Sequence, residues 1–367
     1  MEKKNILFLS PLLPVGGIAS WTMNMIEYIQ KNNIQNIYHI DASIKYKTPN
    51  NAIHPFYRMI SGIVDTSRII YLLVIGCLKY NPKVVQIATP ASFSLFKDFL
   101  FLFVCRIFKA KCIFHYRFGR IPELSKRKNW EWRLLCFNIK HAYRVIVIDE
   151  PSFQTLCENS FKDKVKLIGN PCSPTVRELA AMKVCEKQKN NFLFVGHVIR
   201  NKGIYELLSA FVSLNDNTYL TIIGPYDENT KNELNSIAQK RKGNWVNFLG
   251  SQPSDVVLEY MKTAGALILP SYTEGFPNVV LEAMAAGCPV LATPVGAIAD
   301  MIDANSTQAA GICFEKKSVS AIMDAINNFI ETNDHLTYAI HGKNKVLNNY
   351  CMEIIFPQYE KLWYDDK

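Results

Sequence analysis

The stretch Ser271-Tyr-Thr-Glu-Gly-Phe-Pro-Asn-Val-Val-Leu-Glu-Ala-Met-Ala-Ala-Gly287 decides the fold of this chain. The short apolar run 266–270 before it predicts a buried strand. Pro277 stands where a helix is expected to begin, because its ring already has helical φ and it has no N–H group to leave unpaired. Gly287 and Pro289 predict the end of that helix, and the run 290–293 predicts the next strand. The segment therefore predicts a βαβ unit of a parallel sheet.

The loop that carries Glu274 is expected at the carboxyl end of a parallel strand, where open α/β sheets bind ligands. The N–H groups of Phe276, Asn278 and Val279 at the helix start favour an anion or the oxygens of a sugar. Glu282, about one turn into the helix, is placed to accept hydrogen bonds from two ribose hydroxyls. Two glutamates alone are more often solvated surface residues. The Gly-Phe-Pro between them and the small apolar residues after them favour a binding site.

The pattern Glu274-Gly-Phe-Pro-x4-Glu282-Ala-Met-Ala resembles the E-x7-E signature of retaining glycosyltransferases of family 4, which have the GT-B fold. The resemblance is strong from about residue 191 to residue 302 and weaker before that, so that it spans nearly the whole chain. The other segments that carry it, in the family's order, are Gly16-Gly17, 165–171, 191–203, 219–224, 246–250 and 294–296.

The resemblance implies an α/β chain with two Rossmann-like, doubly wound domains that face each other across a cleft. Residues 1–180 are the expected N-terminal, acceptor-binding domain, and residues 190–350 the expected nucleotide-sugar-binding domain. The C-terminal helix 351–367 is expected to pack back on the first domain. Apolar runs at 6–9, 84–88, 112–115 and 145–148 predict parallel strands, and polar residues at 170–174 and 183–191 predict the linker.

Carried over residue by residue, the resemblance implies that Glu282 holds the ribose of a nucleotide and that Lys202 lies on the diphosphate. Glu274 and the backbone from Gly275 to Asn278 would hold the donor sugar. The family usually has an arginine directly after the glycine of its phosphate loop. That position is His197 here, and whether His197 or Arg200 supplies the cation stays open.

Two features of the N-terminal half complete the predicted site. Gly16-Gly17 follows the first strand and precedes a helical run, so that backbone could approach a ligand closely, although a plain turn is the alternative. His115 ends a predicted strand, and the resemblance places it near the reacting sugar, whereas a lone histidine is more often structural. The predicted site residues are, as catalytic, His115, Lys202 and Glu274 and, as substrate-binding, Gly16, Gly17, Gly196, His197, Arg200, Gly275, Phe276, Pro277, Asn278 and Glu282.

Composition limits where the protein is expected to work. The chain has 367 residues, of which 49% are hydrophobic and 20% charged, which suits two packed domains. Ten cysteines form no Cys-x-x-Cys pair, which favours a reducing compartment. The N-terminal apolar run 5–10 is too short for a signal peptide, and the runs 69–78 and 99–105 are shorter than the roughly 20 residues of a membrane span. We therefore expect a cytoplasmic protein.

Positive charge gathers in the first half of the chain. Residues 1–180 hold 25 Lys and Arg against 12 Asp and Glu, a net +13, whereas the whole chain carries +9. Basic residues alternate with aromatic ones between residues 99 and 143, which predicts a peripheral face for the inner side of an anionic membrane. A solvated helix surface over a Phe-rich core is the alternative. No nucleic-acid-binding motif is present, and we expect no nucleic-acid partner.

The predicted function is metal-independent transfer of a hexosyl or other glycosyl group from a UDP- or GDP-sugar to a hydroxyl, with retention. The acceptor would be a lipid-linked glycan of bacterial surface polysaccharide synthesis. No Asp-x-Asp occurs, so fixed cations would stabilise the diphosphate, and no cofactor is expected. Two alternatives are a GT-B enzyme that hydrolyses or epimerises a nucleotide sugar and a non-catalytic membrane-surface protein. The donor, its sugar, the acceptor and the oligomeric state are not predicted.

Overall fold

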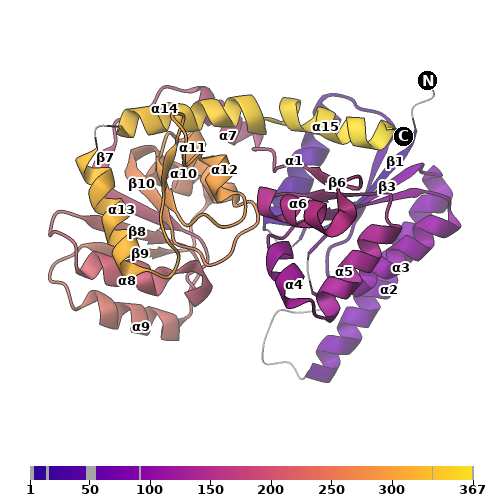
Figure 1. The fold of residues 1–367 in the computed structure, drawn as a ribbon, viewed down its shortest axis with the longest axis horizontal. Coiled ribbons are helices and arrows are strands. Elements are labelled where there is room, and N and C mark those ends of the chain that lie inside the picture. The colour runs from indigo at the N-terminus through magenta and orange to yellow at the C-terminus, as the bar shows by residue number, and fades with distance from the viewer. Residues whose placement is uncertain (1–3, 14–15, 47–54, 91, 333, 366–367) are drawn as a thin grey trace. The chain divides into compact units, whose positions relative to one another are not determined.

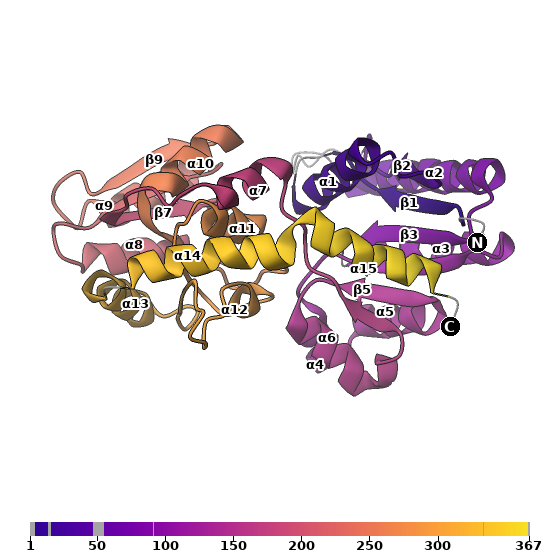
Figure 2. The same ribbon diagram turned by 90° about the horizontal axis from the view of Figure 1, so that it is seen from above.

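The chain folds into two compact units, each built on one parallel β-sheet. The computed structural model describes residues 4–13, 16–46, 55–90, 92–332 and 334–365. The first unit comprises Met1–Pro171 and Ile355–Lys367, and the second comprises Cys172–Ile354. The chain therefore passes from one unit to the other at two places. Figures 1 and 2 show helices on both faces of each sheet.

The first unit has six parallel strands in the order β2-β1-β3-β4-β5-β6. The chain turns from one side of β1 to the other, so that β1 and β3 flank the point where the strand order reverses. The strands are β1 (Ile6–Ser10), β2 (Ile37–Asp41), β3 (Val84–Thr89), β4 (Lys111–Tyr116), β5 (Arg144–Val147) and β6 (Val165–Leu167). The helices are α1 (Gly17–Lys31), α2 (Pro55–Tyr80), α3 (Ser94–Ile107), α4 (Ile121–Arg127), α5 (Trp130–His141), α6 (Glu150–Leu156), a π-helical turn (Cys157–Phe161) and most of α15 (Met352–Tyr364).

The second unit repeats the plan in the order β12-β11-β10-β7-β8-β9, with the reversal between β7 and β10. Its strands are β7 (Gln188–Val195), β8 (Tyr219–Ile223), β9 (Val246–Gly250), β10 (Ala264–Leu269), β11 (Val290–Ala292) and β12 (Gly311–Cys313). Its helices are α7 (Pro174–Ala181), the 3₁₀ turn η2 (Arg200–Lys202), α8 (Ile204–Val212), α9 (Glu228–Ala238), α10 (Ser254–Thr263), α11 (Asn278–Ala285), α12 (Ile298–Met301), α13 (Val319–Glu331), α14 (His335–Lys345) and the π-helical turn η3 (Val346–Tyr350).

The central strands are apolar because helices cover both faces of each sheet. Every residue of β1, β3 and β10 is buried. The helices bury one stripe each, as α8 does with Leu207, Leu208 and Phe211. The two sheets thus have separate hydrophobic cores, one in each unit.

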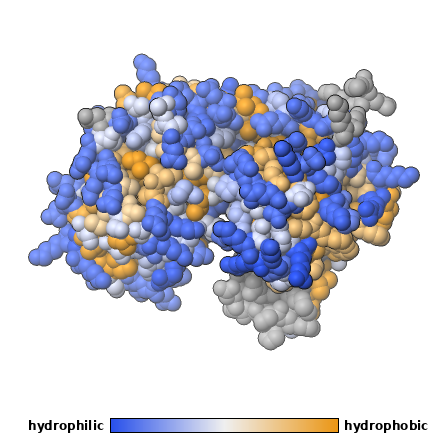
Figure 3. Space-filling view, viewed as in Figure 1, coloured by the Kyte–Doolittle hydropathy of each residue, from blue (hydrophilic) through white to orange (hydrophobic). Residues whose placement is uncertain are grey.

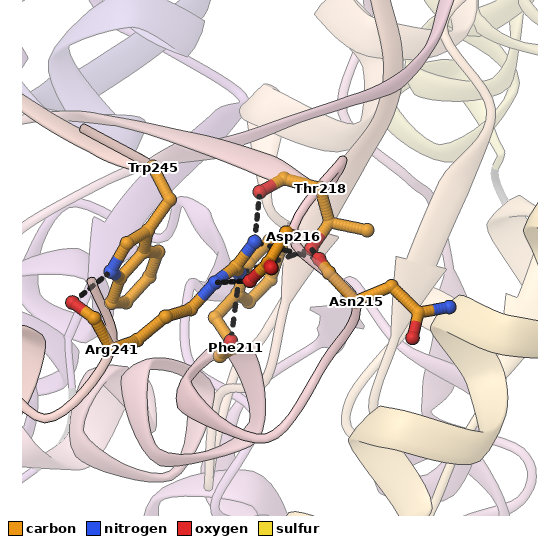
Figure 4. A network of polar contacts seen from close by, with 6 residues as sticks. All are labelled: Phe211, Asn215, Asp216, Thr218, Arg241 and Trp245. Carbon is orange, nitrogen blue, oxygen red and sulfur yellow. Dashed lines mark hydrogen bonds and ion pairs between the residues drawn. The ribbon is translucent and has the colours of Figure 1, made fainter. Parts of the chain in front are cut away.

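A buried arginine ties the helical layer of the second unit to its sheet. The guanidinium of Arg241 donates to the carbonyl oxygens of Phe211, Asn215 and Thr218 at 2.9, 2.6 and 3.1 Å, and to Thr218 Oγ1 at 3.1 Å. Its Nε lies 3.9 Å from the exposed carboxylate of Asp216. Figure 4 shows this fork reaching from the α9–β9 connection to the α8–β8 loop. Burial lowers the pKa of the guanidinium, so these carbonyls offset its desolvation.

The predicted two-domain α/β fold is confirmed, with differences at the edges. The apolar runs at 6–9, 84–88, 112–115 and 145–148 correspond to β1, β3, β4 and β5. The edge strands β2, β6 and β12 were not predicted as strands. The change of unit falls at Pro171, earlier than the expected boundary between residues 180 and 190, because α7 packs against α11 and η3. The residues after Ile355 lie in the first unit.

The expectation that no segment is long enough to span a membrane was wrong for one helix. Within α2, residues Ile60–Tyr80 form a stretch of 21 residues with a mean hydropathy of 1.6, of which 28% is buried. The sequence analysis considered only the apolar run 69–78, whereas the apolar stretch of the helix begins at Ile60 and includes Asp65, which is 3% exposed.

Candidate functional site in the second unit

Two loops leave neighbouring carboxyl ends at the point where the strand order of the second unit reverses. The loop after β7 runs from Gly196 to Gly203, and the loop after β10 runs from Pro270 to Pro277. Because the crossover helices leave toward opposite sides, side chains of both loops meet where doubly wound sheets bind ligands. Lys202 comes from the first loop and Glu274 from the second.

Lys202 and Glu274 form an ion pair in this place. Lys202 Nζ lies 2.5 Å from Glu274 Oε1, and the hydroxyl of Ser271 donates to the same oxygen at 2.7 Å. The side chain of Glu274 is 11% exposed and that of Lys202 is 25% exposed. A pair with this little solvent is screened weakly, so each charge fixes the position of the other. The sequence assigned both residues to the site, whereas the contact between them was not predicted.

Backbone contacts hold the two loops together. Gly203 has φ +70°, and a Cβ there would lie 2.1 Å from the carbonyl oxygen of Pro270, so a side chain is excluded. Beside it, the N–H of Tyr272 donates to the carbonyl oxygen of Asn201 at 2.9 Å. Lys202 lies between these two contacts in sequence, and its position relative to the second loop is therefore set by the main chain.

The loop after β11 supports Glu274 from another side. Gly296 has φ +59°, and a Cβ on it would lie 2.4 Å from Gly275 O and 2.5 Å from Glu274 O. The next residue, Ala297, donates its N–H to Gly275 O at 2.8 Å. The Pro294-Val-Gly296 segment, which entered the sequence analysis only as part of a resemblance, is thus a physical support of the Glu274 loop.

Sequence reasoning missed three side chains that contact one another at the loop after β10, namely Tyr272, Glu206 and Lys317. The hydroxyl of Tyr272 donates to Glu206 Oε1 at 2.6 Å, and Lys317 Nζ lies 4.7 Å from the centre of the Tyr272 ring. Burial and the Glu206 carboxylate raise the pKa of Tyr272 to about 12. A usable signal existed, because Glu206 opens α8, Tyr272 follows β10 and Lys317 follows β12, all at one edge of the sheet.

His197 and Arg200, the two candidates for the cation that the resembling family supplies with an arginine, lie in the same loop as Lys202. His197 is exposed, next to Gly196 in the loop after β7. Gly196 approaches β8 closely, since a Cβ on Gly224 would lie 1.8 Å from Gly196 O. Arg200 is exposed and stacks its guanidinium 4.2 Å from the centre of the Tyr205 ring. The guanidinium of Arg200 is thus held by an aromatic face.

Glu282 faces a depression of about 380 Å³ that is formed entirely within the second unit. Burial raises the pKa of its carboxyl group. The walls come from α7, α10 and α11, and the polar groups near Glu282 include Ser254, Asp255 and Lys262. The two glutamates of the signature therefore belong to different surroundings, Glu274 to the paired loops and Glu282 to this depression.

The residues between the glutamates form the start of α11. Pro277 is the residue before the first helical one, so the helix begins at Asn278, one position later than predicted. Phe276 is 9% exposed, and its ring packs edge-to-face on Tyr350 with centroids 5.4 Å apart. Phe276 therefore anchors the loop to the unit, while Gly275 bonds to Ala297 through its carbonyl oxygen.

Candidate functional groups in the first unit

His115 lies in β4 and is fully buried. Its ring contacts Trp21 edge-to-face at 4.8 Å, and its Nε2 lies 3.3 Å from an N–H nitrogen of Arg117. Burial, and then the charge of Arg117, lower the pKa of His115 well below its usual value. A neutral ring that accepts from the guanidinium positions Arg117, which also donates to Gly17 O at 3.1 Å. His115 is thus buried itself and contacts the partly exposed Arg117.

Gly16 and Gly17 border a cavity of about 320 Å³ where the strand order of the first unit reverses. Gly16 precedes the first residue of α1 and caps it without a side chain. The wall is mostly apolar, with residues from β1, β3 and α3. Asp98 is 1% exposed and accepts from Thr89 Oγ1 at 3.0 Å. Burial raises the pKa of Asp98 to about 8, so it is a largely neutral acid at pH 7.

The aromatic residues of the predicted basic face divide into two groups. Phe101, Phe114, Tyr116 and Trp132 are buried in the core of the unit. Phe103 and Trp130 are 63% and 46% exposed. Part of the alternation of basic and aromatic residues therefore reflects an ordinary amphipathic core, and part lies on the surface.

Comparison with known proteins

The paired loops, the small apolar α11 and the two doubly wound sheets point to one class of proteins. Residues 177–345 match the family model of glycosyl transferases group 1. That segment contains Lys202, Glu274, Glu282 and the loops that hold them. In the part of the chain that the structure describes, no group of three or more His, Cys, Asp and Glu side chains could hold a metal ion. Metal independence itself stays a prediction.

Three curated relatives are glycosyltransferases by name. The chain is 34% identical over 137 residues to the putative teichuronic acid biosynthesis glycosyltransferase TuaC of Bacillus subtilis. That alignment covers 37% of this chain and 32% of TuaC. It is 30% identical over 188 residues to the capsular polysaccharide biosynthesis glycosyltransferase CapM of Staphylococcus aureus, 47% of this chain and 46% of CapM. It is 29% identical over 176 residues to the N,N'-diacetylbacillosaminyl-diphospho-undecaprenol alpha-1,3-N-acetylgalactosaminyltransferase of Campylobacter jejuni. That alignment covers 47% of this chain and 43% of the relative. The chain spans less than half the length of each.

Solved structures show the fold over nearly the whole chain. Sucrose-phosphate synthase from Thermosynechococcus elongatus superposes with a TM-score of 0.75 at 16% identity, covering 98% of each chain. Anabaena Alr3699/HepE, solved in complex with UDP, superposes with a TM-score of 0.69 at 15% identity over 98% and 99%. With two parallel six-stranded sheets, the chain has the two-domain α/β fold of GT-B glycosyltransferases. At these identities, the superpositions establish the fold alone.

Proposed function

We propose that this protein transfers a glycosyl group from a nucleoside-diphosphate sugar to a hydroxyl acceptor, with retention at the anomeric carbon. The observation that carries the proposal is the Lys202–Glu274 pair, which glycine contacts hold where the strand order of the second unit reverses. A fixed ammonium beside a fixed carboxylate suits a ligand with both an anionic diphosphate and sugar hydroxyls.

In this mechanism the second unit binds the donor. Lys202, with Arg200 or His197, would stabilise the negative charge that grows on the diphosphate as the sugar–phosphate bond breaks. Removing one such donor typically costs about 10²–10³ in rate. Glu274 and the backbone from Gly275 to Asn278 would orient the sugar, and Glu282 in its depression would bind the ribose hydroxyls. The UDP bound to Anabaena Alr3699/HepE supports a uridine nucleotide as the first candidate. Fixed cations would take the place of a metal ion.

The acceptor would be a lipid-linked glycan in the synthesis of a bacterial surface polysaccharide. The names of the relatives support this class, since one acts on a diphospho-undecaprenol-linked sugar and others belong to capsule and teichuronic acid synthesis. Arg117, positioned by His115 beside Gly17, is the cation that the first unit would offer to this acceptor. The protein would work in the cytoplasm on the inner face of the membrane, with its basic residues between 99 and 143 toward anionic lipid.

A thermal-shift panel of UDP-, GDP- and ADP-sugars tests the donor site. One nucleotide sugar is expected to raise the melting temperature, and Lys202→Ala is expected to remove the shift, while Lys242→Ala, an exposed lysine outside the site, keeps it. No shift with any donor would contradict the donor site. NMR of the product then distinguishes retention from inversion at the anomeric carbon, and an inverted product would contradict the retaining mechanism.

A further inference from the structure

Three helices of the first unit expose apolar side chains to solvent over a continuous part of its surface. On α2, Ile63, Tyr71 and Leu78 are 58%, 64% and 66% exposed, and on α3, Phe96 and Phe103 are 52% and 63% exposed. Helix α3 packs against both α2 and α5. Figure 3 shows apolar side chains gathered over this part of the molecule. A patch of this kind on a soluble domain marks a surface that binds something apolar.

In these three helices the acidic residues are buried and the exposed charged residues are basic. Each of α2, α3 and α5 has one acidic residue, and all three are buried: Asp65 is 3%, Asp98 1% and Glu131 7% exposed. Each also has a partner within the unit, namely the backbone N–H groups of Lys45 and Tyr46, Thr89, and Arg120 with the N–H of Ser92. Among the side chains of these helices that the structure describes, the exposed Lys, Arg, Asp and Glu residues are the basic Lys79, Arg106, Arg133 and Lys140.

A groove of about 360 Å³ lies on the same surface between α3 and α5. Its apolar wall includes Phe99 and Phe137, whose ring centres are 5.7 Å apart. Arg106, Lys111 and His141 also line it, and Lys111 Nζ is already engaged, since it donates to Asp365 O at 3.1 Å and lies 4.2 Å from the centre of the Tyr143 ring. His141 stacks on Phe137 at 4.2 Å. A site with cationic and aromatic walls fits a phosphate that is attached to a hydrocarbon chain.

Helix α2 is fixed on the protein along its inner side. Ile69, Leu73 and Cys77 are buried, and Gly76 approaches β2 so closely that a Cβ would lie 2.6 Å from Ile40 Cδ1. A helix with one face fixed in the protein core cannot cross a membrane, but its exposed apolar face can lie along a membrane surface. The exposed apolar face of α2 is therefore available for such a contact.

We propose that the outer faces of α2, α3 and α5 rest on the bilayer, and that the α3–α5 groove takes the phosphate of one anionic phospholipid beside Arg106 and His141. This rests on the proposed function and names the lipid partner and the helices that bind it. It moves the main apolar contact to α2, outside the segment 99–143 that the sequence indicated. A second copy of the chain is a poorer occupant, because two such faces would bring like charges together.

Vesicle flotation of the full chain tests this surface without donor or acceptor. We expect binding to phosphatidylcholine vesicles that contain one third phosphatidylglycerol and much weaker binding to phosphatidylcholine alone. Tyr71→Ser and Leu78→Ser should each weaken binding about tenfold, since each removes an apolar side chain from the lipid contact. Arg106→Gln should weaken it about fivefold, and only on the anionic vesicles. Trp130, stacked on Phe96, should shift its emission to the blue on binding.

Matched controls lie in the second unit. Leu336→Ser removes a side chain that is 60% exposed on α14, and Lys240→Gln removes an exposed charge, so neither should change binding. Equal melting temperatures show that the variants fold. The proposal would be overturned if the wild type bound equally well with and without phosphatidylglycerol, or if the α2 variants bound as well as the wild type. It would also be overturned if the chain dimerised with rising concentration and the α2 variants abolished that dimerisation. Donor binding in the thermal-shift panel is a separate measurement. A negative result for lipid binding therefore does not contradict the donor site, and a negative result for donor binding does not contradict the lipid surface.

Discussion

Gly296→Ala is the sharpest test of how the main chain positions the candidate site. Gly296 has φ +59°, and an added Cβ would meet Gly275 O at 2.4 Å and Glu274 O at 2.5 Å. Ordinary contacts begin near 3.4 Å, so the Glu274 loop must move by about 1 Å. Glu274 would then leave its place beside Lys202. A displacement of about 1 Å at a positioned group costs roughly a hundredfold in rate.

Gly243→Ala is the matched control, because it separates backbone strain from displacement of the loop. Gly243 also has a positive φ, +88°, but an added Cβ meets nothing within 4 Å. Alanine in this region costs about 1–2 kcal/mol, of which about 0.4–1 kcal/mol is offset because alanine also restricts the unfolded chain. Both variants should therefore lose about 1 kcal/mol from this source, and Gly296→Ala should lose more stability through its contacts.

The assay is the release of nucleoside diphosphate during transfer, with urea unfolding measured on the same samples. Gly296→Ala is expected to react about a hundredfold more slowly than the wild type, and Gly243→Ala at a nearly unchanged rate. If Gly296→Ala stays within about threefold of Gly243→Ala, the loop either does not move or does not position a group that matters. Either result would refute the idea that Gly296 supports the site.

Three further changes test other parts of the structure. Lys202→Ala should lower kcat/KM by about 10²–10³ in the same assay, whereas Lys242→Ala should leave it unchanged. Arg241→Lys should lower the free energy of unfolding in urea by about 2–4 kcal/mol, since an ammonium cannot replace the forked contacts of the guanidinium to Phe211, Asn215 and Thr218. Arg177→Lys, an exposed arginine 3.6 Å from Glu353, should cost under about 1 kcal/mol. Asp98 should make wild-type stability fall as the pH rises from about 4 to about 8, because burial raises its folded pKa to about 8 while the unfolded chain ionises near its ordinary value. Asp98→Asn should flatten that slope in urea unfolding at pH 5, 6.5 and 8, and an unchanged slope would contradict the assignment.

The fold was predictable where strands are buried on both faces. The continuous apolar runs of β1, β3 and β10 need cover on both sides, and this alone favours a parallel sheet with crossover helices. The edge strands gave weaker signals. In β6 only Val165 is buried, and β12 is three residues long and begins at Gly311. Their pairing depends on a neighbour that single-sequence patterns do not show.

The candidate site was predictable in its members and not in its contacts. Lys202 and Glu274 were assigned from two separate motifs, 72 positions apart, and the ion pair between them follows only from the order of the strands. The hydrogen bond between Tyr272 and Glu206 was missed, although Tyr272 follows β10 and Glu206 lies in the first turn of α8, at the same edge of the sheet. His115 was expected to point into the site from the end of its strand, whereas its ring is buried against Trp21 of α1 and Tyr359 of α15.

The spacing of eight between the two glutamates has a physical reason in this fold. Glu274 lies in the loop, three residues before Pro277, and there its carboxylate joins the Lys202 pair. Glu282 is the fifth residue of α11, so the helix carries its side chain more than one turn away, to the depression beside α10. A shorter spacing would leave both carboxylates in one loop, where their repulsion would raise one pKa and leave a single binding charge. With a spacing of eight, as the proposed function requires, Glu274 would orient the sugar, Glu282 would bind the ribose, and Lys202 would face the diphosphate between them.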